Sequence, residues 1–125
     1  KKKILIISGG ISKERLISLD TGKQVSKELK KYGYKVIISE PDSNLNKNIK
    51  QFKPNVIFNA LHGKDGEDGV AQSYFEFLKI PYTHSGIMSS YNAMDKIISK
   101  KIFKQHGIAS PKFFSVLSYS PLRNI

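Results

Sequence analysis

The sequence predicts an α/β fold in which a parallel sheet is covered by helices on both faces. Three observations support this. Short apolar runs, rich in β-branched residues, alternate with segments whose apolar residues recur at helical spacing. The connections between them are short. Glycine-rich stretches follow the first and third apolar runs, which is where ligands collect in parallel sheets.

The strands are predicted from uninterrupted apolar runs. Residues 4–7, Ile-Leu-Ile-Ile, have no polar alternation, which is typical of a strand buried on both faces of a parallel sheet. Similar runs predict strands over 34–38, 56–60, 80–83 and 113–117. Together with the helices between them, these strands form the alternating order of a doubly covered sheet.

Helices are predicted over about 13–32, 45–52, 70–78 and 92–106, and Thr83 and Ser85 are candidate caps for a further short helix. The first helix carries Leu16, Leu19, Val25 and Leu29 at roughly helical spacing. Gly22 interrupts that helix, and Gly33 is expected to end it as a glycine C-cap. Gly107 is expected to end the last helix in the same way.

Composition narrows the function classes. The chain has 125 residues, 39% hydrophobic and 25% charged, and no apolar run approaches the roughly 20 residues that cross a bilayer. Without cysteine it has no disulfide or thiolate chemistry, and a cytoplasmic location is permitted. The net charge of +11 allows a nucleic-acid or phosphate partner. Only Arg15 and Arg123 are arginine, so scattered solvated lysines are the favoured interpretation.

The first glycine-rich stretch runs over residues 9–15, Gly-Gly-Ile-Ser-Lys-Glu-Arg. Its glycines permit a tight turn between strand and helix, and exposed amides at a helix start favour anions. Glu14 stands at the same place. It either neutralises the positive end of the helix or faces an amino group of a substrate. The stretch lacks the third glycine of a dinucleotide-binding fingerprint.

The second stretch runs over residues 62–73, His-Gly-Lys-Asp-Gly-Glu-Asp-Gly-Val-Ala-Gln-Ser. His62 directly follows a predicted strand and is either a ligand contact or a structural residue. The acidic residues do not follow the calcium-loop spacing, and no second histidine or cysteine is near, so no metal site is predicted. Glu67 and Asp68 are expected instead to supply an N-terminal charge or a cap for the helix that starts near Gly69. Both stretches should lie on one edge of the sheet.

Taken in order, these motifs closely resemble the D-alanine–D-alanine ligases: Gly-Gly-x-Ser-x-Glu, then His-Gly-x-x-Gly-Glu-Asp-Gly-x-Ala-Gln-Ser, then Pro-Tyr-Thr-x-Ser-Gly and Met-Asp-Lys. The resemblance spans residues 3 to about 117. It implies an ATP-grasp enzyme of the bacterial cytoplasm. ATP, with Mg²⁺, would phosphorylate the carboxylate of one D-alanine, and the amine of a second would attack the acyl phosphate. The product is a precursor of peptidoglycan, and thus of the cell wall and cell shape.

The resemblance also implies roles for single residues. Glu14 would hold the ammonium of the first D-alanine, in a catalytic as well as a binding role, by a charge-assisted hydrogen bond. Ile17 would meet the methyl group, and His62 the substrate carboxylate. Lys96 would approach the ATP phosphates. Two positions depart from the family pattern. His84 replaces a glycine, and a side chain there could change the conformation of the loop. Ile11 replaces a small or hydroxyl residue.

By the same resemblance, residues 1–93 would form a Rossmann-like, substrate-binding domain, and residues 94–125 the beginning of a central ATP-grasp domain. The family's remaining substrate, metal and ATP residues would lie beyond this chain, so it is expected to be inactive alone and homodimeric in the full-length enzyme. Two alternatives remain. One is a stand-alone small-molecule-binding module of the same fold. The other is a basic nucleic-acid-binding protein, for which no recognition motif is present.

Overall fold

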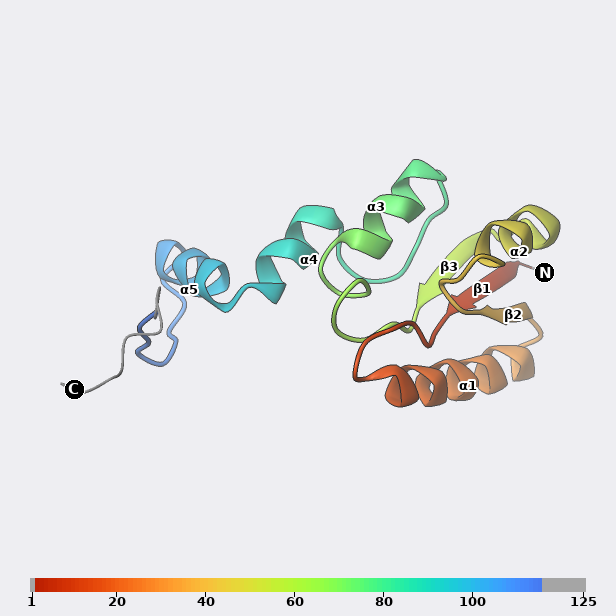
Figure 1. Cartoon of the computed structure of the whole chain (residues 1–125), viewed down its shortest axis with the longest axis horizontal. Helices are drawn as coiled ribbons and strands as arrows, with labels where there is room; N and C mark the ends of the chain where they lie inside the picture. The colour runs from red at the N-terminus through yellow and green to blue at the C-terminus, as the bar shows by residue number, and fades with distance from the viewer. Residues whose placement is uncertain (1, 116–125) are drawn as a thin grey trace.

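A computed structural model describes residues 2–115 and has a three-stranded parallel sheet at its centre (Figure 1). The strands are β1 (Lys3–Ile7), β2 (Lys35–Ser39) and β3 (Val56–Asn59). Their order is β2-β1-β3, so β1 is hydrogen-bonded on both sides. The side chains of β1 are buried on both faces of the sheet, which accounts for the uninterrupted apolar run of residues 4–7.

Helices cover both faces of this sheet, as predicted. Helix α1 (Arg15–Lys31) lies on one face, and α2 (Leu45–Phe52) and α3 (Val70–Phe77) lie on the other. Alternate side chains of β1 divide between the two layers. Ile4 and Ile6 pack with Val25 and Leu29 of α1, whereas the opposite layer combines Leu5, Ile7, Leu45, Ile49, Ile57, Leu61, Ala71 and Phe75. The predicted α/β fold class is confirmed.

The predicted ends of the first three helices agree with the structure to within two residues. Gly33 follows α1 with a φ of 78°, in the left-handed region that glycine adopts without strain. Gly107 ends the last helix with a φ of 67°. Gly22, in contrast, does not interrupt α1. It is buried there, and its missing side chain lets the helix approach Ser8 at the end of β1.

The predicted strand over 80–83 is wrong. This segment forms only a single parallel bridge, Ile57 to Tyr82, at the free edge of β3. Ile57 donates from its amide to the Pro81 carbonyl (2.8 Å) and accepts from the Thr83 amide (3.0 Å). The backbone turns into the left-handed region at Lys79 and again at His84, which leaves too short an extended stretch for a strand.

Tyr82 secures this edge segment. Its hydroxyl donates to Glu76 Oε1 at 2.7 Å, and its ring lies 5.4 Å from that of Phe75. Burial, together with the hydrogen bond to Glu76 and its negative charge, raises the pKa of Tyr82 to about 12. The contribution of this group to stability is therefore complete below about pH 10 and is lost as the pH rises towards 12.

A single helix over 92–106 is also wrong. The structure has two helices there, α4 (Ile87–Met94) and α5 (Lys96–Gln105). Asp95 between them is extended, with a ψ of 112°, and its carboxylate accepts from the amides of Ile97 and Ile98 at 2.8 and 2.9 Å. An aspartate in this geometry starts a new helix instead of continuing the old one.

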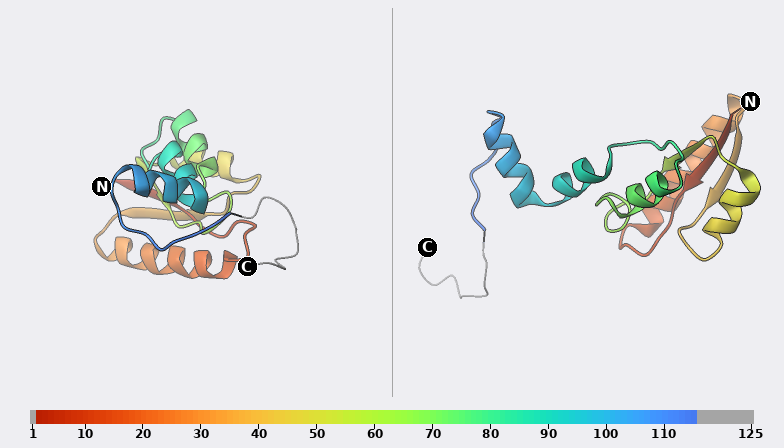
Figure 2. Two further views of the ribbon diagram at one scale, coloured as in Figure 1. Left: turned by 90° about the vertical axis from the view of Figure 1, so that its left-hand side faces the viewer. Right: turned by 90° about the horizontal axis from the view of Figure 1, so that it is seen from above.

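The last predicted strand, 113–117, lies partly outside the described residues. Its described part, up to residue 115, contains no strand. The predicted domain boundary between residues 93 and 94 falls at the end of α4 and stays a prediction. Helices α4 and α5 extend away from the sheet (Figures 1 and 2), and α5 buries none of its residues. Within residues 2–115 no helix is both long and apolar enough to cross a membrane.

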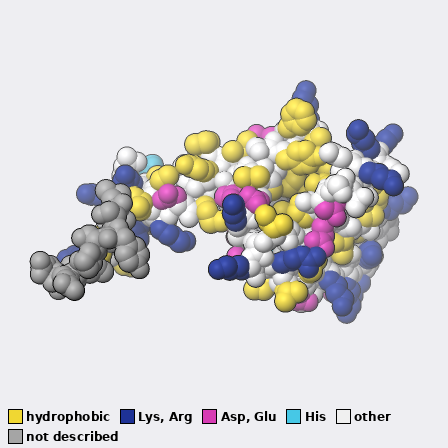
Figure 3. Space-filling model, viewed as in Figure 1, with side chains coloured by type: hydrophobic (Ala, Val, Ile, Leu, Met, Phe, Trp, Pro, Cys, Tyr) yellow, Lys and Arg dark blue, Asp and Glu magenta, His cyan; other side chains and the backbone are white. Residues whose placement is uncertain are grey.

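The lysines on the face shown in Figure 3 are distributed as expected for solvated surface residues. Lysine and arginine side chains are spread over that face, interleaved with apolar and acidic side chains (Figure 3). A nucleic-acid interface would instead gather them into one continuous stripe.

The contact between Gly22 and Ser8 yields a test of the packing of α1. A Cβ on Gly22 would lie 2.6 Å from Ser8 Oγ, so Gly22→Val should lower the free energy of unfolding by about 2 kcal/mol through overpacking. Urea unfolding followed by circular dichroism measures this. Lys23→Val, an exposed neighbour on the same helix, should change stability by less than about 0.7 kcal/mol. Equal effects of the two variants would contradict the proposed packing.

Candidate functional site

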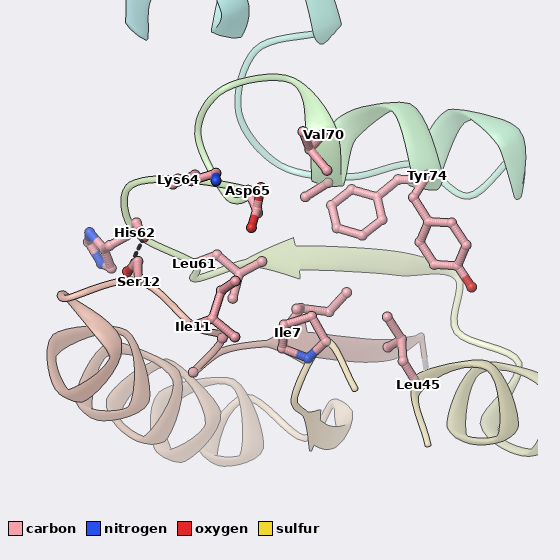
Figure 4. A pocket seen from close by; sticks show the side chains of 15 residues that line it. Ile7, Ile11, Ser12, Leu45, Leu61, His62, Lys64, Asp65, Val70 and Tyr74 are labelled. Carbon is pink, nitrogen blue, oxygen red and sulfur yellow. Dashed lines mark hydrogen bonds between the residues drawn. The ribbon is translucent and has the colours of Figure 1, made fainter. Parts of the chain in front are cut away.

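The strand order brings two loops together at one edge of the sheet. The chain passes from β1 to β2 on one side and then returns to β3 on the other, so the loops after β1 and β3 flank the point where the connections reverse direction. Open parallel sheets bind ligands in this crevice. Ser12 in the first loop donates from Oγ to the carbonyl of His62 in the second at 2.7 Å (Figure 4). The predicted common edge is confirmed.

The first loop is held on three sides. Gly9 and Gly10 have φ values of 92° and 80°, which favour glycine, and the Glu40 carboxylate lies against Gly9. The amide of Gly9 donates to Ser18 Oγ (2.8 Å), which itself donates to the Ala60 carbonyl (2.7 Å). These contacts fix the loop between α1, the end of β2 and the end of β3.

The start of α1 is tied to the end of β2. Arg15 donates from its guanidinium to Glu40 Oε1 at 2.5 Å, and both side chains are about two-fifths exposed. Exposed ion pairs contribute little to stability. Here the pair orients the first turn of α1, directly after Glu14.

The second loop is built around two buried amides. Asn59, 3% exposed, donates to the Gly66 carbonyl (2.8 Å) and accepts from the Leu61 amide (3.2 Å). Gln72 of α3, 1% exposed, donates to the same carbonyl at 3.0 Å. Both amides satisfy backbone groups that the loop would otherwise bury without partners. Neither side chain was singled out by the sequence analysis, because a polar residue in an apolar context does not reveal its partner.

The acidic residues of this loop bind backbone amides. Asp68 accepts from the amides of Val70 (3.2 Å) and Asp65 (2.9 Å), so its predicted place at the start of α3 is confirmed. Glu67 does not cap that helix, because its Oε2 accepts from the Gly63 amide at 2.7 Å within the loop, so of the two expected roles only that of a nearby charge is left to it. In residues 2–115, no three His, Cys, Asp or Glu side chains gather in a group suited to a metal ion.

The structure places the Glu14 carboxylate against Gly63, the residue that follows His62 in the second loop. Glu14 is the exposed N-cap residue of α1, and its Oε2 lies where a Cβ on Gly63 would approach to 2.7 Å. His62 is half-buried, with Nε2 3.5 Å from Thr21 Oγ1 of α1. Ile17, 57% exposed, lies three positions after Glu14 on the same helix. The edge therefore presents an acceptor, an imidazole and an apolar side chain.

Lys96 lies apart from these residues. It is exposed at the first position of α5, in the part of the chain that extends away from the sheet. The other two positions noted in the sequence are also exposed. His84 adopts a φ of 79°, a backbone that favours glycine, and its Nε2 lies 2.8 Å from the Asn59 carbonyl oxygen. Ile11 is 85% exposed.

Two pockets adjoin this edge, and His62 lines both. The first has a volume of about 310 Å³ and mainly apolar walls from the β1 loop, α2 and α3, with Ser12, Lys64 and Asp65 at its polar side (Figure 4). The second, about 360 Å³, is more polar and includes Thr21, Glu67, Gln72 and His84. The Oε1 atom of Gln72 is buried without a hydrogen-bond partner. Both volumes are in the range of small-molecule sites.

A parallel sheet with two glycine-rich loops at its switch point defines the class of open α/β domains that bind ligands at this position. Comparison with known proteins identifies its relatives. Residues 38–85 match the family described as "D-ala D-ala ligase N-terminus". The chain is 71% identical over 112 residues to the D-alanine–D-alanine ligase of Pelagibacter ubique, covering 90% of this chain and 37% of the relative. It is 45% identical to that of Wolbachia pipientis wMel, covering 97% and 38%.

Solved structures agree. The D-alanine–D-alanine ligase of Bacillus anthracis complexed with ATP has a TM-score of 0.80 at 35% identity, over 98% of this chain and 44% of that one. The D-alanyl-alanine synthetase A of Vibrio cholerae has a TM-score of 0.84 at 26% identity, over 97% and 42%. The resemblance drawn from the motifs is thereby confirmed, since the chain is similar over most of its length to part of these D-alanine–D-alanine ligases. It spans less than two-fifths of the length of the sequence relatives just named.

The buried amide of Asn59 provides a test of how the second loop is held. Asn59→Asp removes the donor to Gly66 and buries a carboxylate, so the free energy of unfolding should fall by about 2–4 kcal/mol. Amide hydrogen exchange should also accelerate across residues 60–69. Asn44→Asp, an exposed position before α2, is the control and should change stability by less than about 0.5 kcal/mol. Unchanged exchange in 60–69 would contradict the assigned role.

Proposed function

We propose that this chain is the N-terminal, substrate-binding part of an ATP-dependent ligase that joins two D-alanines. The observation that carries the proposal is the position of the Glu14 carboxylate beside Gly63, the residue after His62, where the two loops meet at the switch point of the sheet. An amino acid carries an ammonium and a carboxylate on one carbon, and these two loops supply a carboxylate and an imidazole. The D-alanine–D-alanine ligases that the chain resembles supply the substrate class.

Each side chain has a role in this proposal. The Glu14 carboxylate makes no hydrogen bond within residues 2–115, so it is available to accept from the ammonium of the first D-alanine in a charge-assisted bond. His62 would orient the substrate carboxylate as a donor or a cation. Ile17 would contact the methyl group, since its exposed side chain lies one helical turn beyond Glu14. This chain thus binds and orients the first substrate.

ATP would activate the carboxylate of the bound D-alanine, with Mg²⁺ offsetting phosphate charge, before the amine of the second D-alanine attacks and phosphate leaves. Within this chain, Lys96 is suited to meet phosphate, because its positively charged side chain is exposed at the start of α5. No group of side chains in residues 2–115 suits Mg²⁺. Its ligands, and most of the ATP site, would belong to the rest of the ligase.

The wider setting belongs to the proposal as well. Residues 94–125 would begin the central domain of an ATP-grasp enzyme, and the full-length ligase would be a homodimer of the cytoplasm. Its product would enter peptidoglycan synthesis, and with it the cell wall and cell shape. D-alanine and ATP are the proposed partners, with no role for nucleic acid or membrane. The scattered lysines of Figure 3 support the exclusion of nucleic acid.

The proposal is tested by D-alanine-dependent ADP release, measured with Mg²⁺ on the longest product of the gene and on the 125-residue chain side by side. Release by the long form alone is expected, because residues 2–115 contain no metal-binding group of side chains. If neither form releases ADP, the ligase assignment is wrong. D-alanine binding without turnover would then favour the stand-alone binding module, whose supporting observation is the pair of pockets at the edge. DNA binding that falls steeply with salt would favour the basic nucleic-acid-binding protein.

The role of Glu14 is tested in the same long form. Glu14→Gln keeps the shape but removes the charge, so the KM for D-alanine should rise roughly 10- to 100-fold while the KM for ATP stays within about twofold. Steady-state ADP release at varied D-alanine and varied ATP separates the two. Glu28→Gln, at an exposed ion pair near the far end of α1, is the matched control. An equal rise in the KM for D-alanine and the KM for ATP would contradict the role assigned to Glu14.

A further inference from the structure

We infer that Ser12 is a positioning residue that holds Glu14 and His62 in one fixed arrangement. This inference rests on the proposed function for its meaning in the reaction, but its geometry stands independently. One hydroxyl oxygen joins the two loops. It donates to the His62 carbonyl at 2.7 Å, across 50 positions of sequence, and accepts from the amide of Glu14 at 3.1 Å.

Ser12 bonds the backbone of Glu14 and of His62, and their side chains have few hydrogen bonds of their own in the described residues. The Glu14 carboxylate makes no hydrogen bond in the described residues, and the His62 ring has one long contact, 3.5 Å to Thr21. Their positions therefore follow from where the backbone holds them. That backbone is set at residue 14 and at residue 62 by the same hydroxyl. A shift of the Ser12 side chain would move both groups relative to each other.

The close approach of the loops depends on this link. Glu14 Oε2 lies against the backbone of Gly63, and an added Cβ there would come within 2.7 Å of it and 3.5 Å of the Ser12 Cβ. Gly63 also has a φ of 72°. The second loop thus presents bare backbone to Ser12 and Glu14, and a hydroxyl of short reach can connect them directly. Ser12 is half-buried, so its bond to His62 is partly shielded from water.

If Ser12 only capped the start of α1, its hydrogen bonds would stay within residues 12–15. The bond from the Glu14 amide, together with the bond from the Arg15 amide to the Ser12 carbonyl (3.1 Å), forms an ordinary turn at the start of α1. Such a turn would order residues 12–15 and leave residue 62 unaffected. The bond to the His62 carbonyl is what distinguishes positioning of the site from capping of the helix.

The kinetic test uses the long form of the protein with Ser12→Ala, Ser12→Thr and, as control, Ser73→Ala. Ser73 is exposed on α3, and its hydroxyl donates to a backbone carbonyl at the same 2.7 Å, but within its own helix. Ser12→Ala should raise the KM for D-alanine about tenfold and leave the KM for ATP within about twofold. Ser12→Thr retains the hydroxyl and should recover the KM to within about threefold. Ser73→Ala should match the unsubstituted protein.

Amide hydrogen exchange gives a readout that does not depend on activity. Ser12→Ala should accelerate exchange both in residues 12–15 and in residues 62–64, and Ser12→Thr should slow both again. Acceleration confined to 12–15, or a D-alanine KM within twofold of the unsubstituted value, would overturn the inference. If the unsubstituted protein releases no ADP with D-alanine, the proposed function fails, and exchange at 62–64 alone decides whether Ser12 couples the loops.

Discussion

The parallel pairing of β1 between β2 and β3 is the constraint on which the rest of the structure depends. Because the strands are parallel, helices connect them and cover both faces of β1, which is therefore apolar on both. Because the pairing is parallel, the chain leaves β1 and β3 at the same edge. The loop that carries Glu14 and the loop that carries His62 therefore meet, although they are nearly 50 positions apart in sequence. Strand order thus determines where the site lies, and the side chains of the two loops determine its chemistry.

The sequence predicts well what depends on neighbouring residues. The continuous apolar run of residues 4–7 and the helical spacing along α1 are sufficient for the fold class, and Gly33 and Gly107 mark helix ends by their backbone freedom. The two glycine-rich motifs likewise identify the edge of the sheet. The candidate residues were assigned by resemblance. The structure adds that Glu14 lies beside the loop that carries His62, whereas Lys96 lies apart on α5.

What the sequence could not predict depends on distant partners. The separation of α4 from α5 depends on Asp95. Its carboxylate accepts from the amides of Ile97 and Ile98 and so starts a new helix. Residues 80–83 have the apolar character of a strand, but turns at Lys79 and His84 leave one bridge. Glu67 has the sequence position of a helix cap and binds Gly63 instead. Ser12 reads as a turn residue until its bond to His62 is seen.

The central claim is that Glu14 and His62 recognise opposite charges of one amino acid. The most direct measurement is calorimetric binding to the long form of the protein of three ligands: D-alanine, propionate, which lacks the ammonium, and D-alaninamide, which lacks the carboxylate. The account predicts that Glu14→Gln weakens D-alanine and D-alaninamide but not propionate. It predicts equally that His62→Gln weakens D-alanine and propionate but not D-alaninamide. If each variant weakens the binding of all three ligands alike, the two residues stabilise the loops and do not recognise the charged groups of the substrate.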